Sequence, residues 1–226
     1  GNGNDVGSEC DIALDAQNRA RIAYLDSDTF SLKFAYDAPP QFVDPKDWHV
    51  RTITEDWNVS GPLELSVLGN GSDVILWIDN DTRFLQTSYF TSTFWRHESV
   101  IESEIDGYNA RVHEEDRVRI LHQTGGIIRS LDWPNMTSIN IDAAAWIGAP
   151  LDQEVQAGGE PQLVYSAENN TEIQFVRSIE DRREGRISSE PSLVLDASSA
   201  SAKSADVNCD GLTDFILFMN QSLLVH

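Results

Sequence analysis

The sequence contains no long run of apolar residues, which argues against a helical membrane span. No stretch of the 226 residues approaches the roughly 18 consecutive apolar residues that a transmembrane helix needs. The chain is nevertheless 40% hydrophobic with six tryptophans, so it has enough apolar side chains for a sizeable folded core. It opens at Gly1 with neither Met nor a signal peptide, and we therefore expect a processed product or an excised fragment.

Positive charge is also scarce. The chain has 16 Lys and Arg against 37 Asp and Glu, which gives a net charge of −21 at pH 7. So strong a negative charge argues against nucleic acid and against anionic membranes as partners. It suits cation binding, a salty or calcium-rich medium, or a basic protein partner.

Cysteine is nearly absent, since the chain contains only Cys10 and Cys209, at its opposite ends. In an oxidising compartment such a pair would form a disulfide that joins the two ends. Against this, Cys10 is expected near the start of a strand and Cys209 in a loop that follows one. Those positions can face opposite sides of the fold, so bridged and free cysteines both stay open.

Familiar catalytic motifs are missing. The sequence has no sialidase box S-x-D-x-G-x-T-W, no G-x-S-x-G, no H-E-x-x-H and no phosphate-binding loop. The acidic run 114–116 after His113 indicates an exposed turn rather than a metal site. With 37 carboxylates, close pairs arise by chance, and no glycosidase pair stands out. The absence favours a non-catalytic module.

What the sequence does contain is an internal repeat. A short apolar segment recurs five times, and its central residues are separated by 53, 45, 43 and 53 positions. These central residues are Ile22, Ile75, Ile120, Leu163 and Ile216. A second apolar segment follows ten residues later at Leu32, Leu85 and Ile173, and eight residues later at Ile128. The segment Tyr24–Tyr36 matches Trp77–Tyr89 most closely, which indicates internal duplication.

Each repeat reads as four short strands, because residues alternate with a period of two and β-branched and aromatic residues are frequent. In the first two repeats we expect strands at 10–14, 20–25, 32–36, 48–54, 63–67, 73–78, 84–90 and 94–101. Four antiparallel strands every 40–50 residues or so make the blade of a β-propeller. The sequence therefore predicts an all-β propeller in one domain, 1–226, with blade units at about 8–57, 61–106, 108–150, 155–195 and 201–226. We expect the five central residues to be buried between blades.

One loop carries the ligand spacing of a calcium site. Oxygen-bearing side chains stand at its positions one, three, five and nine, Gly211 stands at position six, and a backbone carbonyl at position seven supplies a further oxygen. The predicted ligands are Asp206, Asn208, Asp210, the Leu212 carbonyl and Asp214. Leu217 replaces the bidentate Glu of an EF-hand, so the loop joins two strands. The alternative is an Asp/Asn/Gly-rich turn without a metal.

This loop, residues 205–218, resembles the D-x-N-x-D-G-x-x-D calcium loop of FG-GAP/VCBS repeats, which are β-propeller blades of integrin α subunits and many bacterial surface proteins. The resemblance implies a structural Ca²⁺ and an extracellular or cell-surface protein. Corresponding loops at 15–18, 69–73 and 114–116 lack the full ligand set and indicate plain turns. FG-GAP rings usually have about seven blades, so the five units form either a complete ring or part of a larger one.

Six N-glycosylation sequons accompany this pattern, at Asn58, Asn70, Asn80, Asn135, Asn169 and Asn220. They favour secretion with glycans attached at exposed turns. The alternative is that Asn-rich turns create the sequons by chance.

Two classes of function follow. The first is a non-catalytic extracellular binding, adhesion or scaffold module that presents loops to a protein or glycan, or to neighbouring subunits of a surface assembly. The second is an extracellular glycosidase or lyase that degrades polysaccharide. Trp48, Trp77 and Trp95 are expected to pack between blades. Trp57, Trp133 and Trp146 lie near strand ends, where they either pack or stack on sugar rings.

Overall fold

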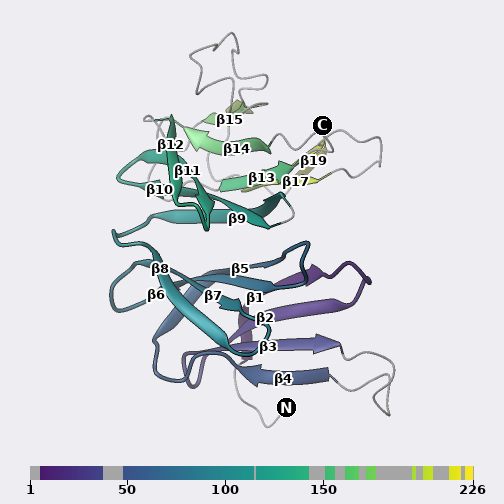
Figure 1. Ribbon diagram of the computed structural model, residues 1–226. Coiled ribbons are helices and arrows are strands. Elements are labelled where there is room, and N and C mark those ends of the chain that lie inside the picture. Colours follow the sequence, from purple (N-terminus) through teal and green to yellow (C-terminus); the bar gives the residue numbers. More distant parts are fainter. Residues whose placement is uncertain are drawn as a thin grey trace. The chain divides into compact units, whose positions relative to one another are not determined.

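The computed structural model consists of antiparallel β-sheets joined by turns (Figure 1). It describes residues 6–37, 48–114, 116–142, 151–155, 161–167, 172–176, 195–196, 201–205, 214–219 and 222–225. These residues include no helix, and hence none long and apolar enough to cross a membrane. The chain divides into two compact units, Gly1–Glu104 and Ile105–His226.

The first unit contains two four-stranded sheets in which the strands follow one another in chain order. Sheet 1 consists of β1 (Val6–Leu14), β2 (Ala20–Asp26), β3 (Ser31–Asp37) and β4 (Trp48–Thr52). Sheet 2 consists of β5 (Val59–Val67), β6 (Asp73–Asp79), β7 (Leu85–Phe90) and β8 (Trp95–Ile101). The first strand of each sheet, β1 and β5, contact each other.

The second unit follows the same plan. Sheet 3 consists of β9 (Gly107–Glu114), β10 (Arg117–Thr124), β11 (Ile127–Trp133) and β12 (Thr137–Asp142). Sheet 4 consists of β13 (Leu151–Val155), β14 (Pro161–Ala167), β15 (Glu172–Val176) and β16 (Leu195–Asp196), and sheet 5 of β17 (Ser201–Ala205), β18 (Asp214–Met219) and β19 (Ser222–Val225). Strand β13 contacts both β9 and β17. Successive antiparallel sheets whose first strands are neighbours are the blades of a β-propeller.

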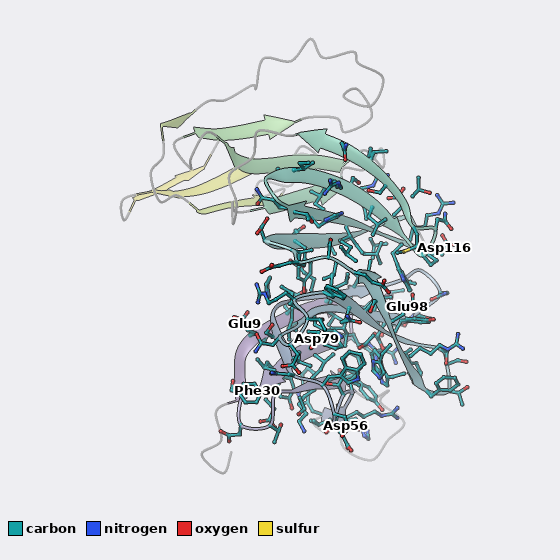
Figure 2. The ribbon with its side chains drawn as sticks, turned by 90° about the vertical axis from the view of Figure 1, so that its left-hand side faces the viewer. Glu9, Phe30, Asp56, Asp79, Glu98 and Asp116 are labelled. Carbon is teal, nitrogen blue, oxygen red and sulfur yellow. The ribbon has the colours of Figure 1, made fainter. Side chains whose placement is uncertain are left out.

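The turns of sheets 1 and 2 repeat each other at an offset of 53 residues. In turn 15–19 and in turn 68–72, the first N–H donates to the carbonyl four residues on, at 3.0 and 2.9 Å. Phe30 and Arg83, at equivalent places in the next turns, both have positive φ, 51° and 61°. Phe30, labelled in Figure 2, is the last residue of its turn, directly before β3. The duplication predicted from the sequence therefore extends to backbone conformation.

The third sheet shows why its second apolar segment follows after eight residues instead of ten. Strands β10 and β11 are joined by Gly125 and Gly126 alone, with φ of 57° and 77°. Two positive φ angles are those of a type I′ turn, the tightest common hairpin connection. The β2–β3 turn has four residues, 27–30, so the shorter turn accounts for the two missing positions.

The core of the first unit lies between sheets 1 and 2. Ala23, Leu25 and Leu32 of sheet 1 pack with Ile75 and Trp77 of sheet 2. The fully buried indole of Trp77 donates to Ser88 Oγ at 2.9 Å. Burial of a tryptophan with its N–H satisfied stabilises both strands that it joins.

The predicted burial of the central repeat residues holds at Ile75 and Ile120, which are fully buried, and is wrong at Ile22. Ile22 is only partly buried, because neighbouring positions of a strand face opposite sides and Ala23 takes the side that meets sheet 2. Ile22 pairs instead with Ile12, which is 62% exposed. The side chains of Leu163 and Ile216 lie outside the described residues.

Trp48 corrects a second expectation. It does not pack between blades but is 47% exposed at the start of β4. Val50 and Ile22 both pair with Ala35, so these residues share the outer side of sheet 1. Trp48 stands two residues before Val50 on the same strand and therefore lies on that side too. Trp77 and Trp133 are buried, whereas Trp146 lies outside the described residues.

Candidate functional site

The predicted calcium loop lies almost entirely outside the described residues, which exclude Asp206, Asn208, Asp210 and Leu212. Its frame is described: Ala205 at the end of β17 pairs with Asp214 at the start of β18. Residues 206–213 therefore connect two antiparallel strands, as the sequence predicts. Calcium binding stays a prediction. Elsewhere in the described part of the chain, no three His, Cys, Asp or Glu side chains gather to hold a metal ion.

The predicted glycosylation sites that the structure describes lie in turns or beside them. Asn70, Asn80 and Asn135 are exposed, whereas Asn58 is half-buried and its amide donates to Asp81 at 2.8 Å. Asn169 and Asn220 lie outside the described residues. Glycosylation of these sites stays a prediction. Cys10 is exposed on β1, and Cys209 lies outside the described residues, so the disulfide between them stays a prediction too.

A pocket that the sequence did not predict opens between sheets 1 and 2, within the first unit. Its volume is about 180 Å³. Strands β2, β3 and β4 supply one side, and β6, β7, β8 and the β5–β6 turn supply the other. The lining residues are Arg21, Phe34, Tyr36, Arg51, Gly71, Asp73, Phe90 and Trp95.

Aromatic rings form much of the wall. Trp95 meets Phe34 edge-to-face with ring centroids 5.2 Å apart, and lies 5.6 Å from Phe90. Tyr36 stacks on Phe34 at 5.8 Å and on His49 at 5.3 Å. Trp95 is only partly buried and leaves ring surface open to a ligand, whereas the Tyr36 ring is already covered by its stacking neighbours.

Two arginines lie against the same tyrosine. The guanidinium carbons of Arg21 and Arg51 are each 5.5 Å from the centroid of the Tyr36 ring. Strand register explains the arrangement, because Arg21 pairs with Tyr36 across β2 and β3, and Arg51 pairs with Phe34 across β3 and β4. The pocket therefore combines aromatic surface with two permanent positive charges.

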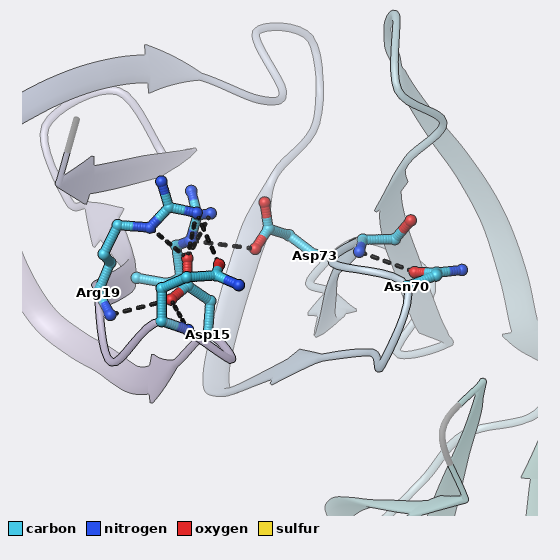
Figure 3. A network of polar contacts seen from close by, with 7 residues as sticks. Asp15, Arg19, Asn70 and Asp73 are labelled. Atoms are coloured by element: carbon cyan, nitrogen blue, oxygen red, sulfur yellow. Dashed lines mark hydrogen bonds and ion pairs between the residues drawn. The ribbon is translucent and has the colours of Figure 1, made fainter. Parts of the chain in front are cut away.

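A polar network supports this wall from the β1–β2 turn (Figure 3). Asp15 is bridged to Arg19 at 2.7 Å and to Arg21 at 3.1 Å. Burial opposes ionisation of Asp15, but hydrogen bonds from Arg19 and Gln17 outweigh it and lower the pKa of its carboxyl. Asp15 thus stays ionised and fixes the Arg21 side chain in place.

Asp73 is the unusual member of the pocket. The residue is 5% exposed, and its Oδ1 lies 3.8 Å from Arg21 Nε, too far for a hydrogen bond. Neither atom has a hydrogen-bond partner among the described residues. Burial raises the pKa of Asp73 to about 6, against the opposing charge of Arg21 and with a reinforcing effect of Asp15. A buried polar group left unpaired in a pocket is one that a ligand can satisfy.

Sequence reasoning missed this site because its members are dispersed over 75 positions, from Arg21 to Trp95, with no motif spacing. Trp95 was expected to pack between blades, and it does contact the core, but it also lines the pocket. The only usable signal was strand register. Once β2, β3 and β4 are paired in this register, Arg21, Tyr36 and Arg51 must share one face of sheet 1.

No family model matches the sequence, and no curated protein matches it either. Among solved structures, the chain is similar to a DUF4623 family protein from Bacteroides eggerthii, with a TM-score of 0.55 and 12% identity over 100% of this chain and 60% of that one. It is similar to TolB from Acinetobacter baumannii, with a TM-score of 0.53 and 11% identity over 96% and 52%. It is also similar to an exo-β-1,3-galactanase from Phanerochaete chrysosporium, solved with galactose. The TM-score is 0.54, and the sequence identity is 9% over 97% of this chain and 58% of the galactanase.

These similarities concern the fold. TolB is a β-propeller protein, so the similarity and the arrangement of the sheets confirm the predicted all-β propeller class. The chain spans 52–60% of the length of the three structures. None of them bears on the FG-GAP/VCBS resemblance of residues 205–218, which stays a prediction.

Proposed function

We propose that this protein is a non-catalytic β-propeller module that binds a glycan in the pocket between sheets 1 and 2. The observation that carries the proposal is the pairing of aromatic surface, from the partly buried Trp95, with the unsatisfied carboxyl oxygen Oδ1 of Asp73. A sugar ring packs its C–H face on an aromatic ring and offers hydroxyls that both donate and accept hydrogen bonds. Arg51 and Asp73 supply the matching donor and acceptor.

Binding is better supported than hydrolysis. Among the described residues that line the pocket, Asp73 is the one carboxylic acid. A glycosidase uses two carboxyl groups, on opposite sides of the bond that it breaks. Asp15 does not supply the second carboxyl group, because its side chain is only 2% exposed and forms ion pairs with two arginines. The galactanase shares the fold, and its structure with galactose supports a sugar ligand without implying catalysis here.

We also propose that the module lies outside the cell or on its surface and that the loop 206–214 holds a structural calcium ion. The six sequons and the ligand spacing of that loop support this setting. Treatment of the native protein with an N-glycosidase tests secretion, and we expect its mass to fall. An unchanged mass would count against a glycosylated extracellular protein.

Calorimetric titration of the whole chain with a panel of neutral and acidic oligosaccharides tests glycan binding. The Arg51→Ala variant should weaken the strongest interaction by about tenfold, because a hydrogen bond to a charged group contributes about 1.5–3 kcal/mol. Arg96→Ala is the matched control, since Arg96 is an exposed arginine of β8 that does not line the pocket. No measurable binding of any oligosaccharide, or equal loss in both variants, would refute the proposal.

A further inference from the structure

The pocket concentrates positive charge in a chain that is strongly negative overall. Three guanidinium groups, from Arg19, Arg21 and Arg51, lie in or directly behind it, with two carboxyl groups, from Asp15 and Asp73. Even with both carboxyls ionised, the cluster carries one net positive charge, whereas the chain carries −21. Charges farther away than about 10 Å are largely screened at ordinary salt, so the local cluster decides which ligand is preferred.

From this arrangement we propose that the pocket selects sugars that bear a carboxylate, namely uronic acid residues of a polysaccharide. The inference rests on the proposed glycan-binding function and names its ligand class. The ring of the uronic acid packs on Trp95, and its carboxylate meets the guanidinium of Arg51, which Tyr36 supports from below.

Arg51 is free to take this part. Its side chain is exposed, lies over Tyr36, and forms no ion pair with any residue that the structure describes. Arg21, in contrast, is already bridged to Asp15. A planar guanidinium binds a carboxylate through two parallel charge-assisted hydrogen bonds, which are stronger than those it forms with the neutral hydroxyls of a sugar. The stacking of Arg51 on Tyr36 also holds the guanidinium in place before the ligand arrives.

Asp73 makes this binding depend on pH. Its carboxylate repels an acidic ligand. The charged or titratable groups that interact with Asp73 are Arg21 on β2 and Asp15 in the β1–β2 turn, and Tyr36 on β3 and Arg51 on β4 line the pocket with it. His49 on β4 stacks on Tyr36. The pKa of Asp73, raised to about 6 by burial, lies well above that of a sugar carboxyl. At pH 5 Asp73 is therefore mostly protonated while the ligand remains ionised. Protonation removes the repulsion and creates an O–H donor.

The test compares an oligogalacturonide and an oligoglucuronide with their methyl esters, which keep the sugar ring and lose only the charge. Titration of the whole chain at pH 5 should show the acids binding about tenfold tighter than the esters. Arg51→Ala should abolish that preference, and Arg96→Ala should keep it. Between pH 5 and 7.5 the affinity for the acids should fall roughly fivefold, because binding and protonation of Asp73 are linked. Asp73→Asn, which is neutral at both values, should remove this dependence.

The other possible outcomes distinguish failure of carboxylate selection from failure of glycan binding as a whole. Esters or neutral oligosaccharides that bind as tightly as the acids would overturn carboxylate selection and leave glycan binding intact. Absence of binding to acids, esters and neutral sugars alike would overturn the proposed function as well. A fall in affinity with pH that persists in Asp73→Asn would refute the role of Asp73. If that variant does not fold, the exposed Arg51 and its Arg96 control still decide the ligand class.

Discussion

At the scale of single residues, the surroundings of each buried ionisable group decide the direction in which its pKa moves. Asp15 and Asp73 lie in the same unit and are both nearly inaccessible to solvent. Asp15 accepts hydrogen bonds from two backbone N–H groups and from arginine side chains, and its pKa falls. Asp73 has no such donors among the described residues, and its pKa rises. Hydrogen bonds to the charged form, not burial by itself, separate a structural carboxylate from one available for a ligand.

His122 allows a test of the same principle in the second unit. Burial, reinforced by the charge of Arg129, lowers the pKa of His122 to about 4 from its ordinary 6.5. The folded state therefore holds this proton less tightly than the unfolded state does. Above pH 6.5 the residue is neutral in both states and has no effect. As pH falls from 6.5 towards 4, the free energy of unfolding should drop by up to about 3 kcal/mol.

Urea unfolding of the wild type and His122→Gln at pH 7.5 and at pH 4.5 measures this effect. The variant should lose clearly less stability on acidification than the wild type. The comparison at pH 7.5 serves as the control, since it reports the packing change alone. An identical loss in both proteins would show that His122 is not held neutral by burial.

At the scale of elements, the tight connection between β10 and β11 makes a backbone prediction. Gly125 has a φ of 57°, and a Cβ atom added there would meet nothing within 4 Å. Any loss of stability on substitution must therefore come from backbone conformation rather than from a clash. Gly125→Ala should lower the free energy of unfolding by about 1 kcal/mol, because L-residues other than Asn and Asp rarely adopt this conformation.

Gly125→Asn is the matched variant, because Asn tolerates a positive φ better than Ala does. Urea midpoints should rank the wild type first, the Asn variant second and the Ala variant last. An Ala variant as stable as the Asn variant would mean that the turn is not of type I′.

The strands themselves were largely predictable from the sequence. Alternation placed the first strands at 10–14 and 20–25, and the structure has them at Val6–Leu14 and Ala20–Asp26. Alternation also says which residues share a face, but not which face meets the next sheet. Both Ile75 and Ile22 were expected to be buried, and for this reason the expectation is right for Ile75 and wrong for Ile22.

The pocket was not predictable by the same reasoning. It requires knowing that Arg51 on β4 and Trp95 on β8 lie on facing sheets, and no local pattern contains that information. Asp73 stands out only once its lack of hydrogen-bond partners among the described residues is known. From the sequence alone, an aspartate at the first position of a strand would be interpreted as part of the preceding turn. Conversely, a calcium site could be predicted from the sequence because all of its expected ligands lie in nine consecutive residues, and it stays a prediction.

At the scale of the whole molecule, the large negative charge favours divalent cations, and the loop 206–214 concentrates it. Three of its predicted ligands are carboxylates within nine residues, and if they converge on one point without a cation they must repel one another. A calcium ion bound only by the folded state would reverse this repulsion and stabilise the whole chain. The gain would be about 2.7 kcal/mol at a free calcium concentration one hundred times the dissociation constant.

Thermal unfolding in millimolar calcium and in EDTA measures this linkage. We expect the Tm of the wild type to rise with calcium and that of Asp210→Ala to be nearly independent of it, because the variant loses a central carboxylate ligand. Asp28→Ala is the matched control, since Asp28 is an exposed aspartate in the β2–β3 turn, outside the loop. Its calcium dependence should equal that of the wild type. A wild-type Tm that is the same in calcium and in EDTA would remove the calcium site, and with it the feature on which the FG-GAP resemblance depends.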